Sequence, residues 1–169
     1  MIELTEEPYD GPVATPLIDA LLADLNARYA GWADDAGRPE HQAEEDADWR
    51  AGVTPGDVVA PCGAFVVAWL DGEPVGCGAL RRSSVDGEAE VKRMYAAPAA
   101  RRRGVAAAVL AELEARASSF GYRALRLETG TAQPEAIALY EREGWHRIEP
   151  FGRFRDHPAS VCLGKELRP

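Results

Sequence analysis

Apolar residues recur at helical spacing near the start of the chain. Leu17, Leu21, Leu22 and Leu25 fall on one side of a helix if residues 16–30 are helical, because that spacing follows the 3.6-residue turn. We therefore expect an amphipathic first helix over residues 16–30.

Residues 31–57 mix Gly and Pro with acidic residues, which are densest from Glu44 to Asp48. This composition predicts a long loop, either without regular structure or with one short helix. Two interpretations stay open: the loop borders a substrate site, or it is a solvated acidic segment.

The middle of the chain has the pattern of strands. Residues 64–70 (AFVVAWL) and 74–80 (PVGCGAL) flank the pair Asp71-Gly72, which is typical of a two-residue hairpin turn. A third strand is expected over residues 88–96, after a second Asp-Gly turn. The pattern predicts a meander of three antiparallel strands.

The last third of the chain alternates helical and strand patterns. Residues 102–120 carry one apolar stripe and end at Gly121, a natural helix stop. Residues 122–129 alternate as a strand, residues 134–144 begin with Pro and end with Gly as helices do, and residues 160–167 form a last apolar strand. This order predicts an α/β fold with a mixed sheet.

The composition is that of one globular domain. The chain has 169 residues, 46% of them hydrophobic, and no apolar run approaches the roughly 20 residues that span a bilayer. The N-terminus is acidic and does not resemble a signal peptide. We therefore expect a soluble, cytoplasmic protein.

The charge is acidic, with 19 Lys and Arg against 28 Asp and Glu, for a formal net charge of −9. This balance argues against binding to a nucleic-acid backbone and favours a cationic partner.

The cysteines and histidines show no disulfide or metal-binding spacing, so we expect reduced thiols and no metal. They are Cys62, Cys77, Cys162, His41, His146 and His157.

Three cations, Arg101, Arg102 and Arg103, stand directly before Gly104 at the start of the predicted helix. A helix start presents unpaired N–H groups and the positive end of the helix dipole, and small residues allow an anion to approach them. The segment RRRGVA therefore predicts a phosphate or pyrophosphate site. ATP and NAD are disfavoured, because neither a P-loop nor a GxGxxG motif is present.

A basic patch for RNA is an alternative for this segment, supported by the nearby Lys92 and Arg93. The acidic total and the lack of interleaved aromatic residues argue against it.

RRRGVA resembles the Q/R-x-x-G-x-G/A motif of the GNAT superfamily of acyl-CoA-dependent N-acetyltransferases, with Arg101, Gly104 and Ala106 at the defined positions. EVKRMYAAP resembles the strand before that motif, and LRLETGTAQPEAIALYEREGW resembles the strand and helix after it. The resemblance covers about residues 63–167. Two positions depart from the common pattern: Ala106 replaces Gly, and Gln133 replaces Asn.

The resemblance implies a GNAT fold: a mixed, mostly antiparallel twisted sheet flanked by helices, in which two neighbouring parallel strands splay apart to form the acyl-CoA site. Those strands are residues 88–96 and 122–129. Residues 1–169 then form one domain, with an acyl-CoA-binding core at 63–167 and a variable acceptor-side part at 1–62.

The resemblance also implies acetyl-CoA as co-substrate. Its pantetheine arm would pair with the backbone of the 88–96 strand, and its pyrophosphate would lie on the amides of residues 102–106. The implied cofactor-binding residues are Met94, Tyr95, Ala96, Arg101, Arg102, Arg103, Gly104, Val105, Ala106, Gln133, Ala136 and Tyr140.

Acyl transfer to an amine requires a base, because an alkylamine with a pKa of about 10.4 is charged at pH 7 and its deprotonation costs about 4.6 kcal/mol. The resemblance favours Glu90 for this role. Its alternative is an ion pair with Lys92 or an arginine, and Glu88, Glu128 and the acidic loop are rival bases.

Tyr140 matches the general-acid tyrosine of the superfamily, which protonates the departing thiolate. The alternative is a core aromatic packed beside Ile137. A backbone N–H near Met94 would stabilise the oxyanion. We expect direct attack in a ternary complex, because Cys77 lies in an apolar strand with no histidine nearby in sequence and nothing in the sequence marks Cys62 or Cys162 as an activated thiol.

The implied function is N-acetyl transfer to a primary amine of a small molecule or peptide. The acidic charge favours a cationic acceptor such as a polyamine, an aminoglycoside-like compound or a lysine side chain. Phe151 and Phe154 either line the acceptor pocket or pack in the core. Three alternatives stay open: a non-catalytic acyl-CoA sensor, transfer of a longer acyl group, and transfer to oxygen. The resemblance also leads us to expect a homodimer.

Overall fold

A computed structural model provides the structure of the protein and describes residues 1–30 and 52–167. The acidic run predicted to lie in a loop, Glu44 to Asp48, is outside these residues. The described chain forms one seven-stranded sheet in the order β1-β2-β3-β4-β5-β7-β6. The strands are β1 (Ile2–Glu6), β2 (Ala64–Leu70), β3 (Glu73–Arg82), β4 (Glu88–Ala96), β5 (Ala124–Gly130), β6 (His146–Arg147) and β7 (Ser160–Glu166).

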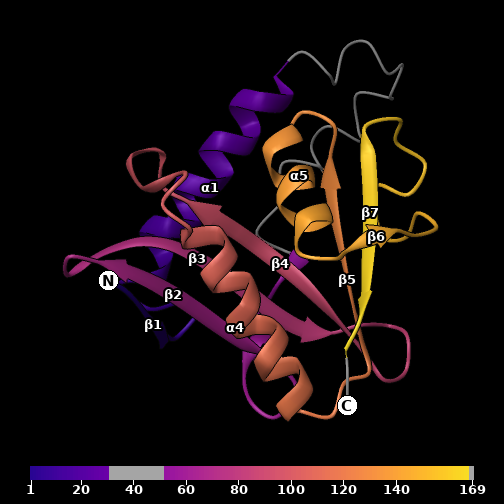
Figure 1. Ribbon diagram of the computed structural model, residues 1–169, viewed down its shortest axis with the longest axis horizontal. Helices are drawn as coiled ribbons and strands as arrows, with labels where there is room; N and C mark the ends of the chain where they lie inside the picture. The colour runs from indigo at the N-terminus through magenta and orange to yellow at the C-terminus, as the bar shows by residue number, and fades with distance from the viewer. Residues whose placement is uncertain (31–51, 168–169) are drawn as a thin grey trace.

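The sheet is antiparallel except between β4 and β5. These two strands are parallel and pair over three positions, the last of which joins Glu90 to Arg126. Beyond that pair they diverge, so that Figure 1 shows them close at one end and apart at the other, with α5 (Pro134–Arg142) beside the gap. The expected mixed, mostly antiparallel sheet with splayed parallel strands is therefore confirmed.

Helix α4 (Val105–Ser119) lies very close to the sheet. Its apolar stripe packs over β3 at Gly76 and Gly78, where an added Cβ would come within 2.6 Å of Val105 Cγ1 and Val109 Cγ1 respectively. The two glycines thus allow a close approach that a larger residue would prevent.

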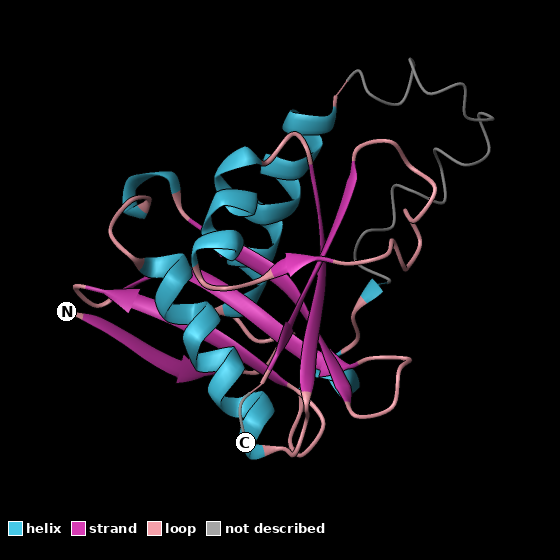
Figure 2. Cartoon of the chain, turned by 45° about the vertical axis from the view of Figure 1, so that its right-hand side comes forward, coloured by secondary structure: helices cyan, strands magenta, loops and turns pink. Residues whose placement is uncertain are grey.

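Helices cover both faces of the sheet (Figures 1 and 2). Val109 of α4 and Tyr140 of α5 belong to one apolar cluster, whereas Leu17 and Leu21 of α1 (Ala14–Tyr29) pack with Phe65 in a second cluster. We call the two sides the α4 face and the α1 face. None of the helices in the described ranges is long and apolar enough to cross a membrane.

The predicted strand bounds 64–70 and 88–96 agree with β2 and β4, and the expected meander is present. The helix predicted from residue 102 begins at Val105 instead, because Arg102 and Gly104 adopt positive φ angles of +62° and +84°. The sequence patterns did not indicate β1, β6 or the short 3-10 helix η3 (Pro98–Ala100), which are too short to show a clear periodicity. The 3-10 helix η2 (Pro55–Val58) begins within the predicted loop, for which one short helix was considered.

Candidate active site

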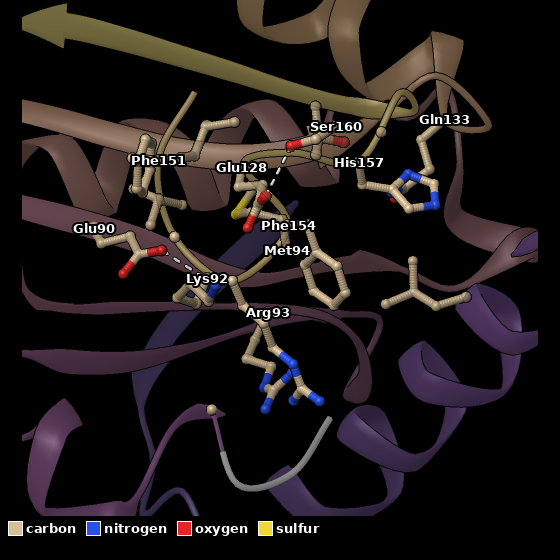
Figure 3. A pocket seen from close by; sticks show the side chains of 18 of the residues that line it. Glu90, Lys92, Arg93, Met94, Glu128, Gln133, Phe151, Phe154, His157 and Ser160 are labelled. Carbon is tan, nitrogen blue, oxygen red and sulfur yellow. Dashed lines mark hydrogen bonds and ion pairs between the residues drawn. The ribbon is translucent and has the colours of Figure 1, made fainter. Parts of the chain in front are cut away.

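A pocket of about 690 Å³ lies where β4 and β5 diverge. This volume is within the roughly 300–1,000 Å³ usual for small-molecule sites. Figure 3 shows that its walls come from β4, β5 and the segment between β6 and β7. Among the predicted site residues, the pocket is lined by Glu90, Met94, Gln133 and Tyr140, together with Phe151 and Phe154.

Tyr140 is held in a buried position on α5. It is 5% exposed, and its ring lies 5.9 Å from that of Trp145, whose indole N–H donates to Glu114 at 2.9 Å. Among the residues that the structure describes, no side chain or backbone group hydrogen-bonds its hydroxyl. Burial raises the pKa of the phenol well above its ordinary value. The hydroxyl therefore keeps its proton and can donate it to a group that enters the pocket.

Glu90 lines the pocket but is already ion-paired on both carboxylate oxygens. Arg81 Nη2 lies 2.7 Å from Oε2, and Lys92 Nζ lies 3.1 Å from Oε1. The residue is 7% exposed. An incoming ammonium proton would have to displace one of these cations first, so the ion-pair alternative considered from the sequence describes Glu90 well.

Glu128, on β5, faces the same pocket from the other strand (Figure 3). Its Oε1 accepts a hydrogen bond of 2.8 Å from Ser160 Oγ. Burial raises the pKa of this carboxyl, and nearby Lys92 opposes the shift in part. A carboxylate with a raised pKa is a stronger base than an exposed one. Of the other rivals, Glu88 pairs with Arg126 and does not line the pocket, and the acidic run from Glu44 to Asp48 lies outside the described residues.

A bulge in β4 changes which side chains reach the pocket. The register of β3 against β4 shifts between Cys77 and Ala79, and Arg93 opposite this shift has a φ of +57°. Val91 and Met94 both pack in the cluster of the α4 face, although regular alternation would place them on opposite faces.

The bulge consequently directs two consecutive cations, Lys92 and Arg93, to the α1 face. Lys92 pairs with Glu90, and Arg93 Nε donates to Tyr9 Oη at 3.0 Å. Sequence reasoning assigned neither residue to the site. The sequence feature that could have indicated the bulge is the adjacent pair of charges, Lys92 and Arg93, in a strand that otherwise alternates.

The start of α4 has the geometry of an anion site. Gly104 is its N-cap with φ +84°, and the first helical hydrogen bond runs from Ala108 N–H to Gly104 O at 2.9 Å, so the preceding amides are not used within the helix. Arg101 is tied to the end of β4, because its Nε donates to the Ala96 carbonyl at 3.2 Å and its Nη2 lies 3.3 Å from Asp24.

The remaining predicted cofactor-binding residues do not line this pocket. They are Tyr95 and Ala96 at the end of β4, Arg101 to Ala106 at the start of α4, and Ala136 of α5, which packs against the cluster of the α4 face.

The end of α1 is fastened to the start of α5 at the open end of the gap. Gln133 Nε2 donates to Tyr29 Oη at 3.1 Å, and Arg28 Nη2 lies 2.6 Å from Glu135. Both Tyr29 and Gln133 line the pocket. These contacts join the two faces across the divergent strands, and sequence reasoning gave no indication of them.

The cysteines are poorly placed for covalent catalysis. Cys77 is fully buried and does not line the pocket, and burial raises the pKa of its thiol to about 12. Within the described residues, no group of three or more His, Cys, Asp or Glu side chains is arranged to hold a metal ion.

Comparison with known proteins agrees with this geometry. Residues 18–145 match the acetyltransferase (GNAT) family, and the chain belongs to that family. Over 103 residues the chain is 40% identical to the IAA acetyltransferase of Azospirillum brasilense. The aligned segment covers 61% of this chain and 67% of that protein.

Solved structures have the same fold. A Klebsiella pneumoniae protein assigned as an acyl-CoA N-acyltransferase superposes with a TM-score of 0.74 and 29% identity, over 99% of both chains. PaiA N-acetyltransferase from Thermoplasma acidophilum, solved in complex with coenzyme A, has a TM-score of 0.66 at 17% identity, over 98% of this chain and 99% of its own. The expected GNAT fold and family are thus confirmed.

We predict that Gly104→Glu abolishes binding of acetyl-CoA. The substitution adds a negative charge at the positive end of α4, and an added Cβ has no neighbour nearer than 3.9 Å, so overpacking does not account for the loss. Gly121→Glu is the matched control, because Gly121 has the same positive φ, has open space around it and follows the other end of the helix. Calorimetric titration should show binding lost in the first variant and kept in the second; equal affinities in the two variants would contradict an anion site at residue 104.

Proposed function

We propose that the protein transfers an acetyl group from acetyl-CoA to an amine by direct attack in a ternary complex. The observation that carries this proposal is the divergence of β4 and β5 after Glu90, with the buried Tyr140 among the residues that line the pocket so formed. Membership of the family and the coenzyme A bound by the Thermoplasma protein support it.

The chain offers suitable groups for both halves of acetyl-CoA. Beyond Glu90 the β4 edge is no longer paired with β5, so the amides of the pantetheine arm can add to residues 91–96 as a short strand. The pyrophosphate then meets the amides and arginines of residues 101–106. This arrangement brings the thioester towards Tyr140 and leaves the α1 face for the acceptor.

Glu128 is the better base in this arrangement, and Glu90 supports it electrostatically. Burial raises the pKa of Glu128, and one of its oxygens accepts a hydrogen bond from a neutral hydroxyl. Both oxygens of Glu90, by contrast, accept from cations. The ammonium of the acceptor first gives one proton to Glu128, and the neutral nitrogen then attacks the acetyl carbon. The second proton that the nitrogen loses as the amide forms restores the phenol of Tyr140 after that phenol has protonated the sulfur. A backbone N–H near Met94 stabilises the oxyanion.

Tyr140 donates to the sulfur when the carbon–sulfur bond breaks. The raised pKa keeps the phenol protonated throughout the working pH range, which suits a hydrogen-bond donor to a developing thiolate. The products are an N-acetylated acceptor and the free thiol of CoA. Direct transfer is favoured over an acyl-cysteine because Cys77 is outside the pocket with a pKa of about 12.

A cytoplasmic location, a homodimer and the division into an acceptor-side part (1–62) and a CoA-binding core (63–167) stay predictions.

We predict thiol release from acetyl-CoA in the presence of a suitable amine. The panel comprises polyamines, aminoglycosides, amino acids, and peptides with lysine or N-terminal amines, with calorimetric titration of acetyl-CoA on the same sample. Turnover with one acceptor class supports the proposal. Binding of acetyl-CoA without turnover of any amine contradicts transfer to amines and favours a sensor module or another acyl group, while absence of binding contradicts the CoA site itself.

We predict that Tyr140→Phe lowers kcat by about 10²- to 10⁴-fold with little change in acetyl-CoA affinity, because it removes the proton donor and keeps the ring. Tyr122→Phe is a matched control: its hydroxyl donates to the Cys62 carbonyl at 2.8 Å and does not line the pocket. Steady-state kinetics with calorimetric titration separate the two effects. Full turnover by Tyr140→Phe would remove this residue from the mechanism.

We predict that kcat/KM rises with pH as Glu128 loses its proton, with a midpoint above the 4.5 of an ordinary glutamate, because burial raises its pKa. Glu128→Gln should remove this acidic limb and lower the plateau by about 10²- to 10⁴-fold. The rise in kcat/KM that comes from deprotonation of the acceptor amine itself, near pH 10 for an alkylamine, should not change in Glu128→Gln. If Glu90→Gln removes the acidic limb and Glu128→Gln keeps it, the roles of the two carboxylates are reversed.

A further inference from the structure

Ser160 stands at the start of β7, on the same side of the sheet as Glu128. In the register of β5 against β7, Glu128 lies opposite Cys162 and Ser160 lies opposite Gly130. Residues opposite each other in an antiparallel pair point to the same side of the sheet, and every second residue of a strand does so. Ser160 is therefore a diagonal neighbour of Glu128, and both residues line the pocket (Figure 3).

The hydroxyl of Ser160 donates to the Glu128 carboxylate. Ser160 Oγ lies 2.8 Å from Oε1 of Glu128, whereas Cys162 Sγ lies at 3.9 Å and is a weak partner, because a thiol sulfur is a poor acceptor. An ionised carboxylate can only accept, so the proton of this hydrogen bond comes from the serine. Such a hydrogen bond to a charged oxygen is stronger than one between neutral groups.

The backbone around Ser160 fixes the position of this hydroxyl. The Ser160 N–H donates to the His157 carbonyl at 2.9 Å, and the Ala159 N–H donates to His157 Nδ1 at 3.0 Å. The Ala159 carbonyl in turn accepts from the Thr131 N–H at 2.9 Å, which ties the start of β7 to the end of β5. The serine is thus held beside Glu128 by the fold itself.

The ionisation of Glu128 depends on two opposing effects. Burial favours the neutral carboxyl and raises its pKa, while the hydrogen bond from Ser160 favours the charged form and lowers that pKa. The segment between β6 and β7 encloses the other oxygen, since a Cβ added to Gly152 would come within 3.3 Å of Oε2. The serine therefore lets this enclosed carboxyl lose its proton at a lower pH than burial alone would set.

We propose that Ser160 is a positioning residue for the reaction: its hydroxyl holds Oε1 of Glu128 and favours the ionised carboxylate that takes the proton of the acceptor ammonium. The inference rests on the proposed function, in which Glu128 is the base, and adds a residue that acts through it. Ser160 keeps its own proton and forms no covalent bond, so the transferred proton passes from the acceptor to Glu128 alone.

Other titratable groups also act on Glu128, and a substitution at Ser160 leaves them in place. Those that line the pocket from the elements around Glu128 are Glu90, Lys92 and Arg93 of β4, Tyr29 of α1, Tyr140 of α5, and Arg153 and His157 of the segment between β6 and β7. Arg126 lies two residues away on β5 and pairs with Glu88. These groups and the residues outside the described ranges are identical in the wild-type protein and in a Ser160 variant. A difference between the two pH profiles therefore reports the lost hydrogen bond.

The test is the pH dependence of kcat/KM. We expect Ser160→Ala to move the acidic limb to higher pH by about 1 pH unit, because it removes a hydrogen bond to the charged form. At a pH below both midpoints kcat/KM is then about 10-fold lower, while the plateau at higher pH changes by less than about 3-fold because the base is retained. Ser160→Thr keeps the hydroxyl and should keep the wild-type midpoint. A lower plateau with an unmoved midpoint in Ser160→Ala indicates a purely structural role and overturns the inference.

Two variants show whether the effect passes through Glu128. Ser119→Ala is the matched control, because it removes an exposed hydroxyl that donates to the Arg116 carbonyl at 2.7 Å near the end of α4, and it should keep the wild-type profile. In a Glu128→Gln background, Ser160→Ala should change kcat/KM by less than about 2-fold at any pH, because its partner charge is absent. A loss in that background as large as in the wild-type protein contradicts the proposal.

A titration followed by NMR separates this inference from the proposed function. Carboxyl-carbon spectra, with Glu128→Gln to assign the signal, give the pKa of Glu128 without turnover, and Ser160→Ala should raise it as far as it moves the kinetic midpoint. An unchanged pKa overturns the inference alone and leaves acetyl transfer intact. A raised pKa with an unmoved kinetic limb shows that Glu128 is not the base, which also overturns it. If protein that binds acetyl-CoA acetylates no amine, the proposed function fails and the inference fails with it.

Discussion

The incomplete pairing of β4 with β5 is the constraint on which the rest of the site depends. The two strands share three residue pairs and then separate, which leaves backbone groups of β4 that a continuous sheet would satisfy internally. The gap persists because it is held at both ends. Arg126 pairs with Glu88 where the strands still meet, and the contacts of Arg28 and Tyr29 with the start of α5 fasten the open end. A ligand with amide groups can satisfy the exposed edge without any rearrangement of the fold.

The bulge in β4 adds a second effect to the same strand. It keeps Met94 on the α4 face, in the same apolar cluster as the helix whose start we propose as the anion site, while it directs Arg93 to the α1 face. A single irregularity thus places neighbouring side chains of one strand on opposite faces of the sheet. The strain at Arg93 is offset by the packing of the sheet on both faces.

Local and global electrostatics act on different properties of this protein. The excess of acidic residues over the whole chain favours solubility, whereas the cations and two glutamates that line the pocket set the charge that a molecule entering it would meet. The two glutamates themselves differ because of their neighbours. Glu90 is balanced by two cations and Glu128 is bonded to a neutral hydroxyl, so similar residues on adjacent strands have different chemistry.

The sequence by itself determined the features that depend on neighbouring residues. Periodicity placed the central strands and helices. The segment RRRGVA indicated the proposed anion site at the start of α4, and the residues around Tyr140 indicated the family. Only the tertiary structure decided which carboxylate is ion-paired on both oxygens, where Arg93 points and how α1 reaches α5. These features depend on contacts between distant residues, such as Tyr9 with Arg93 and Tyr29 with Gln133, and on a bulge whose register involves two strands. Local patterns carry little information about such pairs, because the chain must fold before the residues meet.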